Sequence, residues 1–177
     1  MTTSTDPQEI EVLFDAESIQ ERVEDLGRTL EKDMEGEPLF VSLLSGSVPF
    51  VADLVRAFNS PLRYEFIQVG YAPNEDDAEI LDIQYPVAFE VSGRDLLLVR
   101  DVTTSGVIES YLVSQFLQLG AKRVLVASLV DVPERRTTDF EADFHLFSTT
   151  SDARTLVGYG LKHEGLHGNL PFIGQLA

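Results

Sequence analysis

Apolar and polar positions along this chain alternate between two patterns, one typical of buried strands and one typical of helices. Three mostly apolar runs are too short for helices and predict strands buried on both faces, at residues 39–44, 96–99 and 124–130. Weaker strand patterns lie at residues 11–14, 62–69, 144–147 and 155–159. Because helical segments separate the strands, the pattern predicts an α/β fold with a mainly parallel sheet covered on both faces.

Three segments carry apolar residues at helical spacing. Asp15 is placed to cap the first, whose apolar positions are Ile19, Val23, Leu26, Leu30 and Met34. The second covers residues 50–58 and tolerates Pro49 in its first turn. The third covers residues 108–119, and Gly120 stands where a helix usually ends.

The segment between the 96–99 strand and the third helix ends in small hydroxyl residues and Gly106. Such a turn can bind phosphate, because the first N–H groups of a helix have no partners of their own and lie at the positive end of its dipole. Thr103, Thr104 and Ser105 can add hydroxyl donors. The alternative is an ordinary connection in which Ser105 caps the helix, and the turn alone does not decide between the two.

A second turn of small residues, Ser45-Gly46-Ser47, follows the 39–44 strand. Taken alone, its glycine is explained by simple turn chemistry. Ligands of parallel sheets bind beyond the carboxyl ends of the strands, where we expect both turns to lie. Farther along, residues 70–82 are polar and acidic and are predicted to form a solvated loop.

Length and composition predict one domain. The 177 residues are 44% hydrophobic, and we expect residues 10–177 to form a single domain after a polar, disordered tail at residues 1–9. The chain has no apolar run that approaches a membrane span, and its first residues lack the features of a signal peptide. It has no cysteine, so disulfides and thiolate metal sites are excluded. We therefore expect a cytoplasmic protein.

The net charge of −17 restricts the partners that this chain can bind. A surface with this much negative charge repels nucleic acid and anionic membranes. We therefore expect neither as a partner. Few of the basic residues are lysines, a composition typical of proteins from strong salt, and a halophilic source is a hypothesis that a salt-independent melting temperature would contradict. Phosphate must then be bound locally, by oriented amides or a few well-placed cations.

The run His163-Glu-Gly-Leu-His167 matches the HExxH pattern of zinc proteases. That chemistry needs a stable helix and a third ligand, whereas Gly165 and Gly168 disfavour a helix and no Asp, Glu, His or Cys follows. We interpret the pair as two exposed loop histidines and His145 as a satisfied strand residue. No metal site is predicted.

Several segments taken together resemble the hypoxanthine (guanine) phosphoribosyltransferases, which have the type I phosphoribosyltransferase fold. The resemblance lies in residues 43–56, 96–120, 128–136, 157–161 and 169–174. It implies a central, mainly parallel sheet flanked by helices, with a small hood from the chain ends. It also implies dimers or tetramers, and transfer of ribose 5-phosphate from phosphoribosyl pyrophosphate to a purine base with magnesium.

The chain departs from this family at the positions to which the resemblance assigns chemistry. Where the family has the sequence Glu-Asp, two apolar residues and Asp-Thr-Gly, this chain keeps Asp101 but has Arg100 for the ribose-binding acid and Thr104 for the proton-transfer acid. A threonine cannot act as a base near neutral pH. Family side chains that contact purine, pyrophosphate, metal or phosphate are replaced by Ser45, Ile108, Val132, Thr155, Lys162 and Gly168. Tyr71 matches the tyrosine of the family's catalytic loop.

We therefore hypothesise a degenerate active site that binds a phosphorylated small molecule, such as a nucleoside monophosphate or a sugar phosphate, without efficient catalysis. The predicted phosphate-binding residues are Thr103, Thr104, Ser105, Gly106, Val107 and Ile108, beside the pyrophosphate-loop residues Ser45 and Gly46. The predicted countercharge or base-pocket residues are Arg100, Val132, Thr155, Leu156 and Lys162. One alternative is an active purine phosphoribosyltransferase with an altered acceptor, which alone would need Mg²⁺. The other is a pseudoenzyme that acts as a protein-interaction module.

Overall fold

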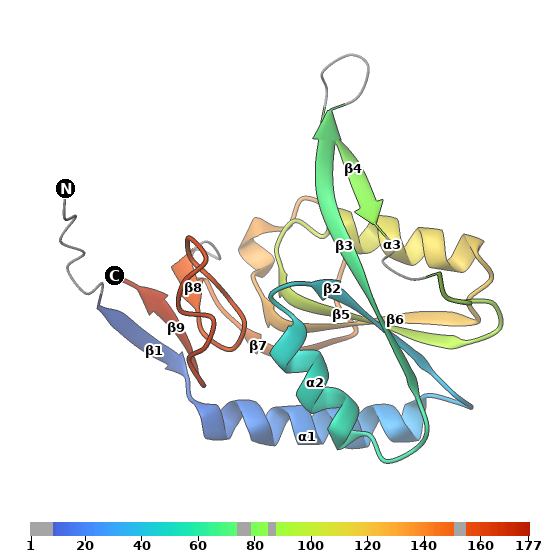
Figure 1. The fold of residues 1–177 in the computed structure, drawn as a ribbon, viewed down its shortest axis with the longest axis horizontal. Coiled ribbons are helices and arrows are strands. Elements are labelled where there is room, and N and C mark those ends of the chain that lie inside the picture. Colours follow the sequence, from blue (N-terminus) through green and yellow to red (C-terminus); the bar gives the residue numbers. More distant parts are fainter. Residues whose placement is uncertain (1–8, 74–78, 85–87, 151–154) are drawn as a thin grey trace.

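The computed structural model describes residues 9–73, 79–84, 88–150 and 155–177. Its main sheet has the strand order β4-β3-β2-β5-β6-β7 (Figure 1), in which β4 is antiparallel to β3 and the other neighbours are parallel. These strands are β2 (Leu39–Leu44), β3 (Arg63–Pro73), β4 (Glu79–Gln84), β5 (Asp95–Thr103), β6 (Arg123–Asp131) and β7 (Phe144–Ser148). The prediction of a mainly parallel sheet is confirmed.

A smaller antiparallel sheet, which we call the hood, is built from the two ends of the chain. Its strand order is β1-β9-β8, with β1 at Ile10–Phe14, β8 at Leu156–Val157 and β9 at Ile173–Leu176. It lies beside the carboxyl-end side of the main sheet in Figure 1. This arrangement confirms the hood that the resemblance implied.

Three α-helices in the described part of the chain cover the main sheet. α1 (Ala16–Asp33) and α2 (Val48–Ala57) pack on one face, α3 (Val107–Gln118) packs on the other, and the short 3₁₀ helix η1 (Pro133–Arg135) follows β6 (Figure 1). As predicted, Asp15 caps α1, and its carboxylate accepts a hydrogen bond from the Ser18 N–H at 2.8 Å. None of these helices has the length and apolarity needed to cross a membrane.

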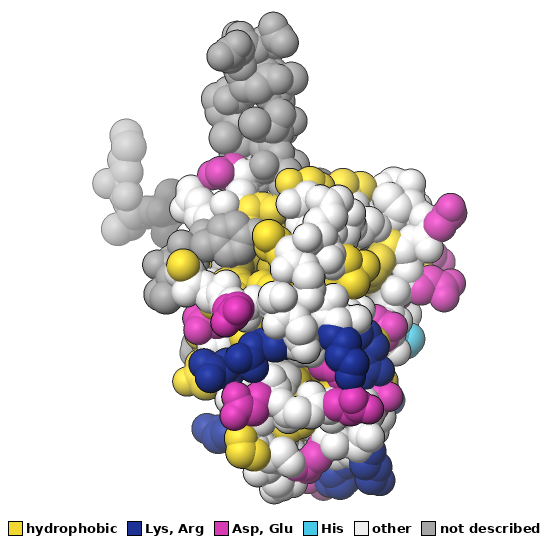
Figure 2. Space-filling view, turned by 90° about the vertical axis from the view of Figure 1, so that its right-hand side faces the viewer, with side chains coloured by type: hydrophobic (Ala, Val, Ile, Leu, Met, Phe, Trp, Pro, Cys, Tyr) yellow, Lys and Arg dark blue, Asp and Glu magenta, His cyan; other side chains and the backbone are white. Residues whose placement is uncertain are grey.

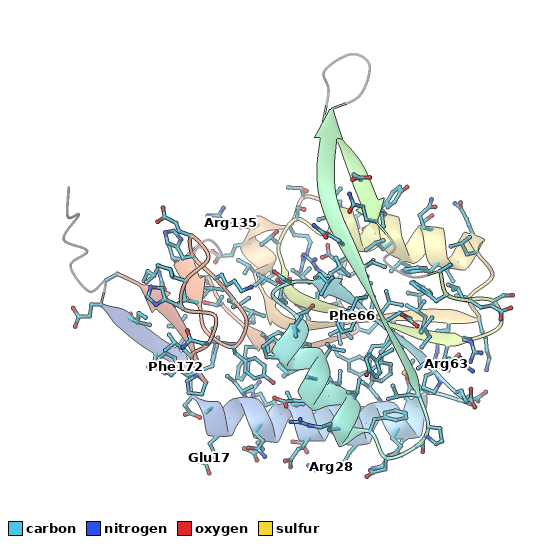
Figure 3. All side chains as sticks on the ribbon, in the orientation of Figure 1. Glu17, Arg28, Arg63, Phe66, Arg135 and Phe172 are labelled. Carbon is cyan, nitrogen blue, oxygen red and sulfur yellow. The ribbon has the colours of Figure 1, made fainter. Side chains whose placement is uncertain are left out.

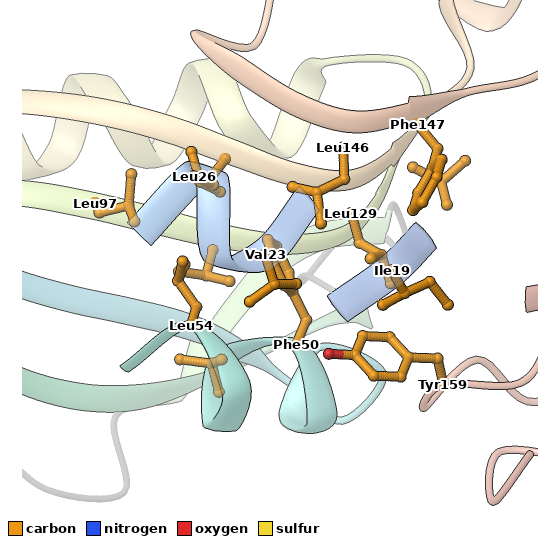
Figure 4. Packing of buried hydrophobic residues seen from close by; sticks show 14 of the residues in the cluster. Ile19, Val23, Leu26, Phe50, Leu54, Leu97, Leu129, Leu146, Phe147 and Tyr159 are labelled. Carbon is orange, nitrogen blue, oxygen red and sulfur yellow. The ribbon is translucent and has the colours of Figure 1, made fainter. Parts of the chain in front are cut away.

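The helical spacing read from the sequence corresponds to the packed face of α1. Ile19, Val23 and Leu26 contact α2 and the sheet in the core shown in Figure 4. Burying each such side chain stabilises the fold by about 1.5–3 kcal/mol relative to leaving it in water. Because this packing holds the sheet in place, it also holds the loops at the carboxyl ends of the strands.

The predicted loop at residues 70–82 is wrong in part. β3 runs on to Pro73 and pairs with β4 from Glu79, so Gly70 and Asp82 are opposite each other in a two-stranded extension. Residues 74–78, and residues 1–8 of the predicted tail, lie outside the described residues. β4 reads Glu-Ile-Leu-Asp-Ile-Gln, in which apolar and polar residues do not alternate strictly, and for that reason the sequence pattern did not reveal it.

Candidate functional site

Three loops that are far apart in sequence meet beyond the carboxyl ends of β2 and β5. They surround a cavity of about 370 Å³ whose lining residues are Ser45, Gly46, Arg100, Asp101, Val102, Leu156, Gly160, Leu161 and Lys162. The structure therefore brings together six of the residues named from the sequence, from the β2–α2 turn, the end of β5 and the hood: Ser45, Gly46, Arg100, Asp101, Leu156 and Lys162. We call this space the strand-end cavity.

Two glycines allow these loops to approach one another. A Cβ added at Gly46 would lie 2.1 Å from Oδ2 of Asp101, and one added at Gly160 would lie 2.2 Å from the Gly46 carbonyl oxygen. Gly160 also has a φ of +97°, which side chains rarely adopt. The glycine of the Ser45-Gly46 turn is thus required by close packing, beyond its turn chemistry.

Tyr159 fixes the hood next to this contact. Its hydroxyl donates a hydrogen bond to Oδ2 of Asp53 on α2 at 2.7 Å. Burial of the phenol, together with this bond to a carboxylate, raises the pKa of Tyr159, so the hydroxyl stays protonated and remains a donor. The hood loop that carries Gly160 and Lys162 is therefore anchored to the core helix.

Arg100 is held by a buried carboxylate on α3. Its Nε lies 2.6 Å from Oε1 of Glu109, whose side chain is 3% exposed, and its Nη2 donates to the Val102 carbonyl at 3.0 Å. The Nε–H does not point along the line to Oε1, so the contact is an ion pair rather than a linear hydrogen bond. Sequence reasoning missed Glu109, because an acid in the first turn of a helix is ordinarily explained by the helix dipole.

Lys162 is arranged differently. Its side chain is exposed at the edge of the strand-end cavity and makes no hydrogen bond or ion pair with any other described residue. A Cβ placed on Gly168 would lie 2.9 Å from Cγ of Lys162, so the lysine stem crosses the space that a side chain at 168 would need. The two departures at positions 162 and 168 are therefore coupled in space.

The predicted phosphate turn joins β5 to α3 next to this cavity. Gly106 is the N-cap of α3 in the left-handed conformation, with a φ of +79°, whereas the alternative of an ordinary connection placed the cap at Ser105. Ser105 still places its Oγ 3.4 Å from the Val107 N–H. The hydroxyl of Thr103 is fully buried and has no hydrogen-bond partner among the described residues, which leaves a donor without a partner at the start of the turn.

The segment after β6 holds the outside of this turn. Arg136 donates to the Thr104 carbonyl at 2.5 Å and to Asp131 at 2.5 Å, and Thr138 donates to the Ser105 carbonyl at 3.1 Å. These bonds satisfy the carbonyl oxygens of Thr104 and Ser105 from outside the turn. No role for Arg136 came from the sequence, because its contact with the turn is to Thr104, 32 residues earlier in the chain.

Two predicted base-pocket residues lie outside the strand-end cavity. Val132 is 1% exposed and belongs to the hydrophobic core beside α1, and Thr155 does not line the cavity. Leu156 does line it, with only its edge accessible. Side-chain details of Tyr71 lie outside the described residues. The predicted roles of these residues stay predictions.

The histidine-rich run is not a helix. His163 and Leu166 form an isolated antiparallel bridge, and Glu164 and His167 have positive φ angles, so the spacing that a zinc protease needs is lost. His145 lies in β7, as predicted.

The strand-end cavity has a donor set that fits magnesium poorly. Asp101 is its one lining carboxylate, and that side chain accepts the Val102 N–H at 2.8 Å, while Arg100 and Lys162 add two cations. No group of three or more His, Cys, Asp or Glu side chains in the described part of the chain could hold a metal ion. Magnesium prefers oxygen ligands, and neighbouring cations oppose it.

Comparison with known proteins agrees with the fold. The chain is 36% identical to the hypoxanthine-guanine phosphoribosyltransferase of Bacillus subtilis over 93% of this chain and 92% of that protein, and 34% identical to that of Streptococcus pneumoniae over the same shares. Its structure matches a crystal structure of a hypoxanthine phosphoribosyltransferase from Staphylococcus aureus with a TM-score of 0.84 and 29% identity, covering 94% of this chain and 91% of that one. No protein-family model matches the chain.

Proposed function

The chain belongs to the hypoxanthine-guanine phosphoribosyltransferase family, and from that premise we propose that it binds a phosphorylated small molecule without the family's magnesium-supported transfer. The proposed ligand is a nucleoside monophosphate or a sugar phosphate, with its phosphate on the N–H groups of residues 103–108. The one observation that carries the proposal is the Arg100–Glu109 pair, because it puts a fixed cation at the end of β5 where the resemblance implies a ribose-binding acid.

Retained phosphate binding is supported by the turn itself. α3 has twelve residues, so its N-terminus presents a full first turn of N–H groups with the positive end of the dipole. Arg136 and Thr138 hold the turn from behind, so its shape does not depend on a ligand.

Loss of efficient transfer is supported by the chemistry of the replaced residues. Thr104 stands at the proton-transfer position and cannot accept a proton near neutral pH. Two further departures fit the residues packed against them, Arg100 with buried Glu109 and Lys162 with the open space at Gly168. Departures that fit one another in space favour a site rebuilt for binding over one that has simply decayed.

The test is a binding screen run beside a transfer assay. Isothermal titration calorimetry with inosine, guanosine and adenosine monophosphates and ribose 5-phosphate, in EDTA and in magnesium, should give affinities that do not depend on the metal. Phosphoribosyl pyrophosphate with hypoxanthine, guanine or xanthine should give no useful rate of product. A strict requirement for magnesium would overturn the proposal.

An active enzyme with an altered acceptor is the second candidate, and retention of Asp101 at the strand-end cavity favours it. Product formation from phosphoribosyl pyrophosphate and any purine would decide for this candidate. A screen in which no phosphorylated compound binds would instead favour a protein-interaction module.

A further inference from the structure

α3 places a charged side chain, Glu109, inside the fold at the turn where we propose that the phosphate lies, and the following inference rests on the proposed function. We infer that Glu109 is a positioning residue for that phosphate. It holds Arg100 at the end of β5, and its negative charge lowers the affinity of the 103–108 turn for a dianionic headgroup. The turn then releases a phosphate monoester readily, which suits a protein that senses a ligand without converting it.

Glu109 lies at the end of α3 to which the phosphate would bind. It stands three residues after the N-cap, Gly106, within the first helical turn, which rises about 5.4 Å. The carboxylate and a bound phosphate therefore share the positive end of one helix dipole. Two negative groups this close together repel each other, so the acid takes up part of the attraction that the turn would otherwise offer to the ligand.

The burial of Glu109 strengthens this effect. Its side chain is 3% exposed and lies on the packed face of α3 with Leu112 and Phe116. Water and salt screen a buried charge much less than an exposed one. Stability does not account for an acid at this position, because well-packed apolar side chains often replace a buried ion pair without loss. The charge of Glu109 is therefore available to act on a ligand.

Arg100 compensates this charge only in part, because it faces two carboxylates. Its Nε lies 2.6 Å from Oε1 of Glu109, and its Nη1 lies 3.8 Å from Oδ1 of Asp101. A second arginine at the turn, Arg136, is matched by Asp131 at 2.5 Å. Within this set the acids exceed the arginines by one. Removal of the charge of Glu109 would balance the set and favour an anionic ligand.

The charge of the ligand separates this effect from a change in the shape of the turn. A phosphate monoester carries a charge of about −1.5 to −2 at pH 7, whereas a sulfate monoester of the same sugar carries a single negative charge. Because the Coulomb energy is proportional to the charge of the ligand, Glu109 should oppose the phosphate ester about twice as strongly as the sulfate ester. A distorted turn would instead change the binding of both esters alike.

The experiment measures the binding of ribose 5-phosphate and ribose 5-sulfate by calorimetry near neutral pH, in EDTA and at low ionic strength. In Glu109→Gln, which keeps an oxygen for Arg100 and removes the charge, affinity should rise about tenfold for the phosphate ester and about threefold for the sulfate ester. In Glu109→Asp, which keeps the charge, both affinities should stay within about twofold of those of the unmodified protein. Urea denaturation checks that each variant is folded.

Glu17→Gln is the matched control, because Glu17 is an exposed acid in the first turn of α1 and the change alters the net charge equally. It should leave both affinities unchanged. Equal effects of Glu109→Gln and Glu17→Gln would overturn the inference, as would equal changes for the two esters in Glu109→Gln. In both cases binding of ribose 5-phosphate would leave the proposed function standing.

A measurement on the unmodified protein keeps the test decisive should Glu109→Gln not fold. With Glu109 opposing the dianion, the phosphate ester should be preferred over the sulfate ester by no more than about threefold, and a preference above about tenfold would overturn the inference. Failure of the unmodified protein to bind either ester would overturn the proposed function itself, so the two failures are distinguishable.

Discussion

The two ends of the main sheet use the same kinds of charged residue in opposite ways. At the amino ends of the strands, Arg123 binds buried Asp95 at 2.8 Å and Lys122 binds Glu35 at 2.7 Å, so the cations are neutralised within the protein. At the carboxyl ends, Lys162 has no partner among the described residues and Arg100 keeps donors to spare. Arg100 is nonetheless paired with buried Glu109 at 2.6 Å, so the contrast rests on Lys162, whose charge stays open at the edge of the strand-end cavity.

The figures show how far apart these ends lie. In Figure 3 the labelled Arg63 marks the amino-end side and Arg135, on η1, marks the carboxyl-end side. Figure 2 views the amino-end side, where dark blue Lys and Arg alternate with magenta Asp and Glu. At this side of the molecule Arg63 and Arg94 both approach Glu37, at 3.5 and 3.8 Å. Arg63 and Arg94 thus add to the paired charges at the amino ends of the strands.

The sharpest test of the comparison is Arg100→Met. Removing this cation leaves the Glu109 carboxylate buried and unpaired, so we expect a loss of about 3–5 kcal/mol in the free energy of unfolding. The double variant Arg100→Met/Glu109→Met should recover most of that loss, because no buried charge remains. Urea denaturation measures both. A double variant as unstable as the single one would show that the pair is not the cause.

Arg94→Met is the matched change at the other end of the sheet. Arg94 pairs with an exposed carboxylate, so its loss should cost about 1 kcal/mol or less. Similar losses for Arg94→Met and Arg100→Met would show that the burial of Glu109 does not set the cost of losing its partner.

The next largest effect is expected for Asp95→Asn. Burial alone would raise the pKa of Asp95, but the Glu35 N–H and Arg123 outweigh burial and lower it. The variant should lose about 2 kcal/mol in the free energy of unfolding at pH 7, because charge-assisted hydrogen bonds are lost.

The pH dependence of that loss follows from the lowered pKa. A carboxylate with a lowered pKa stabilises the fold above its unfolded pKa, and the contribution is lost as the pH falls through the folded value. The unmodified protein should therefore approach Asp95→Asn in stability below about pH 4. A difference that stays constant from pH 7 to pH 2 would contradict this account.

Gly46→Ala tests whether close packing beside the strand-end cavity is needed for ligand binding. The added Cβ would meet Asp101 at 2.1 Å and force that side chain toward the strand-end cavity. We expect affinity for phosphorylated compounds to fall by about tenfold, which is about 1.4 kcal/mol. Gly70→Ala is the control, since a Cβ there meets no atom within 4 Å. Equal effects of the two variants would exclude Gly46 from the site.

The sequence predicted those parts of the molecule whose burial leaves a periodic or continuous pattern. β2, β5 and β6 were visible as apolar runs, and α1 was visible because its buried residues recur at helical spacing. β4 was missed because its apolar residues, Ile80, Leu81 and Ile83, do not alternate strictly with polar ones, and because it pairs only with β3 at the edge of the sheet. The local pattern of apolar and polar residues indicates which residues are buried. It does not indicate which segments pair at the edge of a sheet.

The candidate site likewise has a part that the sequence predicted and a part that it did not. Its loops were placed correctly, because parallel strands direct their following turns to one edge of the sheet. The contacts that give the site its character were not predictable, since Glu109 beside Arg100 and Gly168 beside Lys162 are side-chain contacts set by tertiary packing. The position of Val132 in the core could not be inferred either, because a valine after a buried strand fits a pocket and a core equally well.

The smallest expected effect belongs to Lys162→Gln measured as stability. A cation that has no partner in the described part of the chain should change the free energy of unfolding by no more than about 0.5 kcal/mol when it is removed. Lys122→Gln, which breaks the contact with Glu35, should lower the melting temperature by more, because Glu35 raises the pKa of Lys122 through a favourable ion pair. Thermal unfolding of both variants in the same low-salt buffer measures the difference. If Lys162→Gln were the more destabilised of the two, the lysine would be held by the fold, and the idea that the carboxyl end keeps a charge open for a ligand would fail.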